Sequence, residues 1–170
     1  MQPGGNFLNY VNEEREFTEQ NNYTNLEDSN GRAIWALGRL LSIRDLLPGE
    51  LIRDAESIMD NALLNINRIH STRAMAFVLY YRHGKNKLIQ DVQLIKEFAN
   101  RLVQMYKHEK SNKWRWFESY LTYANSVLPE AMLCAWLVTD EPAYEEIART
   151  SFDFLLSKIF VTNSIKVISK

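Results

Sequence analysis

Six stretches of helical periodicity, joined mostly by short links, run through this chain of 170 residues. Apolar residues recur in them at the spacing of an α-helix, and turn-forming residues stand between them. Pro48 and Pro142 stand at first helical turns, where proline is tolerated, and Gly84 follows the third stretch as a C-cap glycine does. The pattern predicts an all-α fold with helices over residues 30–44, 48–67, 71–82, 87–108, 127–138 and 142–159.

The six predicted helices differ in how much of their surface is apolar. The first, third and fifth (AIWALGRLLSI, AMAFVLYY and AMLCAWLV) are apolar nearly all round, which is typical of buried helices. The second, fourth and sixth each carry one apolar stripe among charged residues. Inner and outer helices should therefore alternate along the chain as three consecutive αα-hairpins, with short links at 44–47, 83–86 and 139–141. The stripes of the second and sixth helices are Leu51, Ala55, Ile58, Ala62 and Ile66, and Tyr144, Ile147, Ala148 and Leu155.

Composition limits the partners and the compartment. A hydrophobic content of 46% supports a sizeable core, and the net charge of −1, with acids and bases interspersed, gives no basic patch for nucleic acid or a membrane. The N-terminal sequence MQPGGNFLNY lacks the pattern of a signal peptide, and no apolar run is long enough to span a membrane. We expect a soluble, cytoplasmic protein. Its one cysteine, Cys134, excludes an internal disulfide and is predicted to be a buried small hydrophobe.

The two ends of the chain differ from its helical middle. Residues 1–25 are rich in Asn, Gly and Glu and are predicted to form an irregular arm with a short strand near Phe7–Val11, followed by a helical-hairpin domain over 26–170. The chain ends on 160-FVTNSIKVISK-170, an apolar, β-branched run without a cap, so we expect the domain to be cut short there. A naturally short protein completed by oligomerisation is the alternative. Either case leaves inner helices exposed and predicts self-association through them.

Polar residues gather where the inner helices begin. The segment 26-LEDSNGR-32 holds more polar side chains than one helix cap needs. The starts 31-GRAIWAL, 72-TRAMAFV and 129-PEAMLCA also resemble one another, as a degenerate repeat does. Because parallel inner helices bring their N-termini to the same end, we expect these polar starts to line one concave site.

Three segments together resemble a known family: NLEDSNGRAIWALG, STRAMAF and WRWFESYLTYANSVLPEAMLCAW. They are similar to the six-hairpin glycosidase superfamily, especially its bacterial helical domains encoded with or fused to glycosyltransferases. The resemblance covers the chain from about Phe7 onward. It implies half of an (α/α)6 toroid, in which twelve helices close a ring and sugar binds where the inner helices begin. A carbohydrate ligand is the implied partner.

The resemblance implies a carbohydrate-active protein such as a glycoside hydrolase. Glycosidic cleavage generally uses two carboxylates, so we predict Asp28 or Glu118 as a catalytic acid whose partner carboxylate comes from the missing half, which leaves this fragment inactive. Capping is the structural alternative for the acids at helix starts, and ion pairing is the alternative for the arginines. Of Trp114 and Trp116, we expect one to face the cavity, since indole rings stack on sugars, and the other to pack. The predicted substrate-binding residues are Glu27, Asn30, Arg32, Arg73, Trp114, Trp116, Tyr123 and Asn125.

Two other functions are consistent with the same residues. One is a non-catalytic helical scaffold or sugar-binding module that supports a glycosyltransferase. The other is a sugar 2-epimerase, which needs histidine bases, whereas only His70 lies at a site-like end. Phosphate-loop, dinucleotide-binding, zinc-hydrolase and nucleophile-elbow motifs are lacking, and the three histidines lie far apart in the sequence. No metal and no cofactor are expected.

Overall fold

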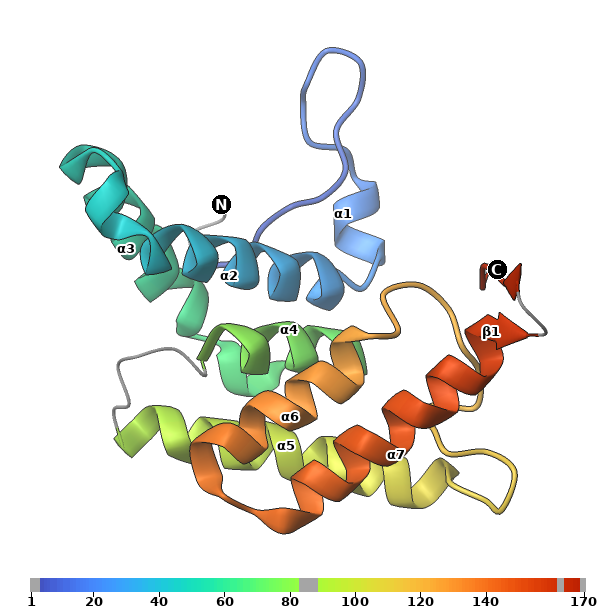
Figure 1. Cartoon of the computed structure of the whole chain (residues 1–170). Helices are drawn as coiled ribbons and strands as arrows, with labels where there is room; N and C mark the ends of the chain where they lie inside the picture. Colours follow the sequence, from blue (N-terminus) through green and yellow to red (C-terminus); the bar gives the residue numbers. More distant parts are fainter. Residues whose placement is uncertain (1–3, 83–88, 162–163, 169–170) are drawn as a thin grey trace. The chain divides into compact units, whose positions relative to one another are not determined.

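The computed structural model describes residues 4–82, 89–161 and 164–168, with side chains for all of these except 80–91. This part of the chain is all-α apart from one two-stranded sheet, as the sequence predicts (Figure 1). Its helices are α1 (Gln20–Tyr23), α2 (Glu27–Ser42), α3 (Gly49–Leu63), α4 (Thr72–Arg82), α5 (Ile89–Glu109), α6 (Val127–Thr139) and α7 (Pro142–Ile159). Two 3-10 turns, η1 (Arg44–Leu46) and η2 (Ile66–Arg68), and the strands β1 (Phe160–Val161) and β2 (Ser164–Ile165) complete the elements.

Each of the six predicted helices is present, as α2 to α7. The sixth agrees at both ends, and the second ends at Leu63 rather than residue 67 because the chain tightens there into η2. Gly84 and the predicted link over 83–86 lie outside the described residues. The expected strand near Phe7–Val11 is wrong except at Val11, which forms an isolated antiparallel bridge with Phe17.

The chain divides into two compact units, Met1–Tyr81 (unit 1) and Arg82–Lys170 (unit 2). In unit 1, α2 and α3 pack against each other as an αα-hairpin joined through η1 (Figure 1). The predicted stripe of the second helix is confirmed at Ala55 and Ile66, which are buried, and wrong at two positions, where Ile52 and Met59 are buried in place of Leu51 and Ile58.

A glycine sets the distance between α2 and α4 in unit 1. A Cβ added at Gly31 would lie 2.7 Å from the Cα of Ala74 and 2.9 Å from its carbonyl oxygen. One turn further along, the rings of Trp35 and Phe77 meet with centroids 5.9 Å apart. The start of α2 therefore approaches α4 more closely than any residue with a side chain would permit.

Asparagine side chains fix the N-terminal arm in unit 1. The Asn21 Oδ1 accepts hydrogen bonds from the N–H groups of Asn9 and Tyr10, and its Nδ2 donates to the carbonyls of Tyr10 and Thr18. Gly5 has a φ of 84°, and a Cβ there would lie 2.0 Å from a carbonyl oxygen of α3. The arm thus has no regular strand, yet side-chain bonds and one close backbone approach define its path.

Unit 2 consists of α5, α6, α7 and the terminal hairpin. The α6–α7 hairpin turns at Asp140, whose φ of 55° lies in the left-handed region that ends helices. All four predicted stripe residues of α7 are buried. At the end of α7, β1 pairs antiparallel with β2 through Phe160 and Ile165.

The expected burial of the first, third and fifth helices holds only in part. Every described side chain of α4 up to Leu79 is buried, as predicted, and α6 buries six residues. For α2 the prediction is wrong: only Gly31, Ile34 and Gly38 are buried there, and Trp35 is 36% exposed. Arginines interrupt the apolar run of α2, so this helix has a solvent-exposed face like that of α3.

Candidate functional site

The acids at the start of α2 hold the start of α4. One carboxylate oxygen of Glu27, Oε2, accepts hydrogen bonds from the backbone N–H groups of His70, at 2.7 Å, and of Ser71. The Asp28 Oδ1 accepts a hydrogen bond from the Ser71 hydroxyl. Leu26 occupies the N-cap position of α2 without a side-chain cap bond, and the Asn25 Oδ1 accepts from the Glu27 N–H at 2.8 Å. The alternative that Glu27 and Asp28 cap their own helix is therefore wrong, because their carboxylates bond to residues just before α4.

Asn30 joins α2 to the arm. Its Oδ1 accepts from the Phe7 N–H at 2.8 Å, and its Nδ2 donates to the Phe7 carbonyl at 3.2 Å and to the Leu26 carbonyl at 2.8 Å. Both ends of the amide are thus used by backbone groups.

The two predicted arginines differ in environment. Arg32 is exposed and donates one long hydrogen bond of 3.4 Å to the Asp28 carbonyl, whereas Arg73 is buried and 5% exposed. The polar starts of α2 and α4 meet in unit 1 through Glu27 and Asp28. The start of α6 belongs to unit 2, so the expectation that all three starts line one concavity stays a prediction.

The aromatic segment before α6 packs in unit 2. Trp116 is fully buried, and its ring meets Phe117 edge-on at 5.5 Å. Trp114 is half-buried; its Nε1 donates to the Glu118 carbonyl at 2.7 Å, and its ring meets Phe154 edge-on at 4.9 Å. Trp116 is therefore a core residue.

The remaining predicted site residues of unit 2 surround a turn. Asn125 is buried, accepts from the Thr122 N–H at 3.1 Å and donates to the Thr122 carbonyl at 2.9 Å. Tyr123 is 43% exposed and Glu118 is half-buried. Asn125 thus closes the turn that leads into α6, while the role of Glu118 as a catalytic acid stays a prediction.

The cysteine is shielded, as the sequence predicts. Cys134 is 5% exposed, and burial, assisted by the Glu130 carboxylate, raises the pKa of its thiol to about 12. The thiolate needed for nucleophilic attack is therefore scarce at neutral pH.

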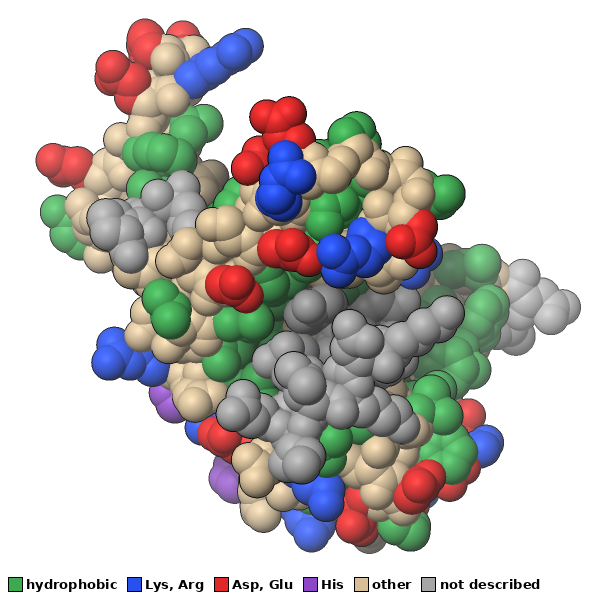
Figure 2. All heavy atoms as spheres, turned by 90° about the vertical axis from the view of Figure 1, so that its left-hand side faces the viewer, with side chains coloured by type: hydrophobic (Ala, Val, Ile, Leu, Met, Phe, Trp, Pro, Cys, Tyr) green, Lys and Arg blue, Asp and Glu red, His purple; other side chains and the backbone are tan. Residues whose placement is uncertain are grey.

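The described residues contain no group of three or more His, Cys, Asp or Glu side chains placed to hold a metal ion. Within the same ranges, none of the helices has the length and apolar character needed to cross a membrane. On the face shown in Figure 2, basic and acidic side chains are interspersed, in agreement with the charge pattern of the sequence.

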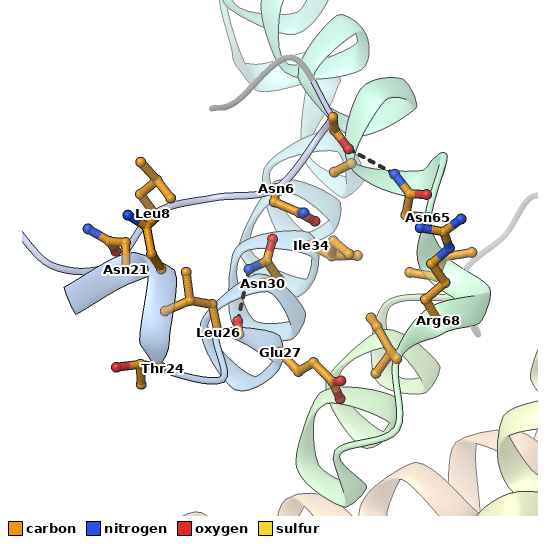
Figure 3. A pocket seen from close by; sticks show the side chains of 15 residues that line it. Asn6, Leu8, Asn21, Thr24, Leu26, Glu27, Asn30, Ile34, Asn65 and Arg68 are labelled. Carbon is orange, nitrogen blue, oxygen red and sulfur yellow. Dashed lines mark hydrogen bonds between the residues drawn. The ribbon is translucent and has the colours of Figure 1, made fainter. Parts of the chain in front are cut away.

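A pocket of about 510 Å³ lies in unit 1 between the arm, α1, α2 and η2 (Figure 3). Its lining combines amide side chains with an apolar floor, and its volume suits a small-molecule ligand. The amides are Asn6, Asn21, Asn22, Asn30 and Asn65, the charged groups are Glu27 and Arg68, and the larger apolar residues are Leu8, Leu26, Ile34, Ile66 and Ile69.

The five amides are not equally available. Asn21 and Asn30 are saturated by backbone partners, and Asn65 donates from Nδ2 to the Gly4 carbonyl at 2.9 Å. The exposed side chains of Asn6 and Asn22 make no hydrogen bond to any described residue. The pocket thus presents two uncommitted amides, held in place by neighbours that are themselves hydrogen-bonded.

Of the predicted site residues, the pocket contains only Glu27 and Asn30. Sequence reasoning missed Asn6, Asn22 and Arg68. The available signal was the number of asparagines in the arm, which was interpreted only as a sign of irregular structure.

No protein-family model, curated protein or solved structure matches the chain.

Proposed function

We propose that this protein is a carbohydrate-binding module and that the unit 1 pocket is its sugar site. The observation that carries the proposal is the amide-rich lining over an apolar floor. A sugar hydroxyl both donates and accepts hydrogen bonds, and the side-chain amides of Asn6 and Asn22 can do the same. The half-buried side chains of Leu8 and Leu26 offer apolar surface to the C–H face of a sugar ring.

The resemblance to the six-hairpin glycosidases supports the same ligand class. Sugar in that superfamily binds where inner helices begin, and the pocket, lined by Glu27 and Asn30, lies at the beginning of α2, which matches the first inner helix by sequence although its burial is lower than expected. The implied setting is support of a glycosyltransferase in the cytoplasm.

Binding is favoured over hydrolysis at this pocket. Glycosidic cleavage generally needs two carboxylates across the scissile bond, and Glu27 is the one acid among the described lining residues. Its Oε2 is already bound by two backbone N–H groups, and the Asp28 carboxylate is bound to Ser71. His70, the candidate epimerase base, is not among the described lining residues. Neither the hydrolase nor the epimerase hypothesis has a specific observation in its favour here.

Isothermal titration calorimetry with the whole chain and a panel of neutral and acidic monosaccharides tests the proposal. One amide hydrogen bond contributes about 1 kcal/mol, so Asn6→Ala and Asn22→Ala should each weaken binding by roughly 3–10-fold. Neither amide bonds to a described residue, so the far-UV circular dichroism spectrum should not change.

Asn112→Ala is the matched control. Asn112 is an exposed asparagine in unit 2 and should leave affinity unchanged. Failure of every sugar to bind, or equal affinity of wild type, Asn6→Ala and Asn22→Ala, would refute the proposal.

A further inference from the structure

We infer that the natural ligand of this pocket is a sugar that carries an anionic group, a carboxylate or a phosphate, and that Arg68 binds this group. The inference rests on the proposed sugar site and specifies its ligand class.

Arg68 enters the pocket from η2. In Figure 3 it lies beside Asn65 at the wall formed by η2, with Asn30 and Ile34 of α2 facing the same space. A guanidinium presents several N–H donors in a planar fork that matches two oxygens of a carboxylate or phosphate. The side chain therefore has both the position and the geometry to bind an anion inside the pocket.

The charge of Arg68 has no ion-pair partner among the described residues, in contrast to the charges of Arg44 and Arg149. Arg44 pairs with Glu56 at 3.0 Å, and Arg149 pairs with Glu145 at 2.8 Å. The Arg68 side chain makes no ion pair and no hydrogen bond with the described part of the chain, and its backbone N–H donates to the Asn65 carbonyl at 3.0 Å. An anion that reaches this guanidinium thus breaks no existing interaction of Arg68.

Glu27, the acidic residue of the described lining, is not bonded to Arg68. Its Oε2 faces the start of α4 and accepts hydrogen bonds from the His70 and Ser71 N–H groups, at the positive end of that helix. The lining therefore combines one cation without an ion-pair partner, one carboxylate that is hydrogen-bonded at the start of α4, and neutral amides. An acidic sugar fits this arrangement, with its anion on Arg68 and its hydroxyls on Asn6 and Asn22.

The test compares neutral and anionic forms of the same sugars. Glucose, galactose and mannose, their uronic acids and their 6-phosphates are titrated calorimetrically into the whole chain, at low salt and at about 0.15 M salt. Wild-type protein should bind at least one uronic acid or sugar phosphate about tenfold or more tightly than the parent sugar. The uronic acids and the phosphates are separate arms, so the tighter arm identifies the anionic group.

Three variants assign the preference to Arg68. Arg68→Gln should remove the preference for the anion and leave affinity for the neutral sugar within about twofold, and Arg68→Lys should keep part of it, since lysine retains charge without the planar fork. Arg53→Gln is the control, because it removes the same charge from an exposed position on α3 outside the described lining.

Neutral and anionic sugars that bind equally well would overturn this inference and leave the sugar site standing. An anion preference that survives Arg68→Gln, or one that Arg53→Gln removes equally, would also overturn it. Binding of no sugar in any form would refute the proposed function itself, and the inference with it.

Discussion

Two segments that look alike as candidate sites in the sequence are built differently in the structure. At the polar start of α2 in unit 1, Glu27 accepts hydrogen bonds from backbone N–H groups just before α4 and Asp28 accepts one from the Ser71 hydroxyl, and Glu27 also lines a pocket. The aromatic segment before α6 in unit 2 buries Trp116 and Phe117 in the core. A concentration of candidate site residues in the sequence therefore corresponds to a set of inter-helix hydrogen bonds in unit 1 and to a hydrophobic core in unit 2.

The two segments differ because one lies beside backbone N–H groups that need hydrogen-bond acceptors and the other covers a hydrophobic core. The backbone N–H groups at the start of α4 lack acceptors within their own helix, and Glu27 supplies one to His70 and Ser71. The segment before α6 lacks helix periodicity but still covers the core, so large rings fill the space. Hydrogen-bonded joints typically contribute about 1 kcal/mol each, whereas a buried indole contributes several. Substitutions in the two segments should therefore differ in the size of their effects.

The largest expected effect is in the aromatic segment. Trp116→Ala removes a fully buried ring that contacts Phe117 and Phe154, and we expect it to lower the free energy of unfolding of unit 2 by about 3–5 kcal/mol. Urea unfolding followed by far-UV circular dichroism measures the change without depending on tryptophan fluorescence.

Two variants serve as controls for this loss. Trp116→Phe keeps an aromatic ring and removes an Nε1–H that has no hydrogen-bond partner in the described structure, so it should cost less than about 1.5 kcal/mol. Tyr120 is 56% exposed, and Tyr120→Ala should stay within about 0.5 kcal/mol of wild type. Similar losses for Trp116→Ala and Tyr120→Ala would contradict the assignment of Trp116 to the core.

A smaller loss is expected where α2 meets α4 in unit 1. In Gly31→Ala the new methyl group would overlap the backbone of Ala74, and we expect a net destabilisation of about 1–3 kcal/mol despite the better helix propensity of alanine. Differential scanning calorimetry should show a lower melting temperature for the transition of unit 1.

Gly49→Ala is the matched control for this substitution. A Cβ at Gly49 would meet only the Arg53 side chain, at 3.6 Å, which is ordinary contact, so stability should be unchanged or slightly raised. If Gly31→Ala proved as stable as Gly49→Ala, the close approach of α2 and α4 would be wrong.

Local signals explain why the helices were predictable. Periodicity and the prolines at helix starts located α3 and α7 to within a few residues, because these signals depend on neighbours in the sequence. Two stripe positions on α3 were misplaced by one residue, because Leu51 and Ile52, and likewise Ile58 and Met59, are adjacent apolar residues and either member of each pair fits a helical period. The burial of α2 was overestimated because its arginines were not given enough weight against its apolar neighbours.

The site was less predictable because its contacts are distant in sequence. Glu27 and its partner His70 are 43 residues apart, and the Asn65 side chain reaches Gly4 across 61 residues. No local pattern in the sequence encodes such pairs. The same holds for Asn30 and Arg68, which the fold of unit 1 brings to one pocket from α2 and η2.

The smallest expected effect is at the carboxylate joint. Glu27→Gln keeps one side-chain oxygen as an acceptor but removes the negative charge at the start of α4, so unit 1 should lose about 1 kcal/mol of stability. Hydrogen exchange of the His70 and Ser71 amides should accelerate several-fold, because these two N–H groups depend on that oxygen. Glu19→Gln makes the same chemical change at an exposed residue whose side chain caps no helix, and it should leave both readings at their wild-type values. Equal exchange rates in the Glu27→Gln and Glu19→Gln variants would show that Glu27 does not stabilise the start of α4. The start of α2 would then not be a hydrogen-bonded joint, and its contrast with the aromatic core of unit 2 would be wrong.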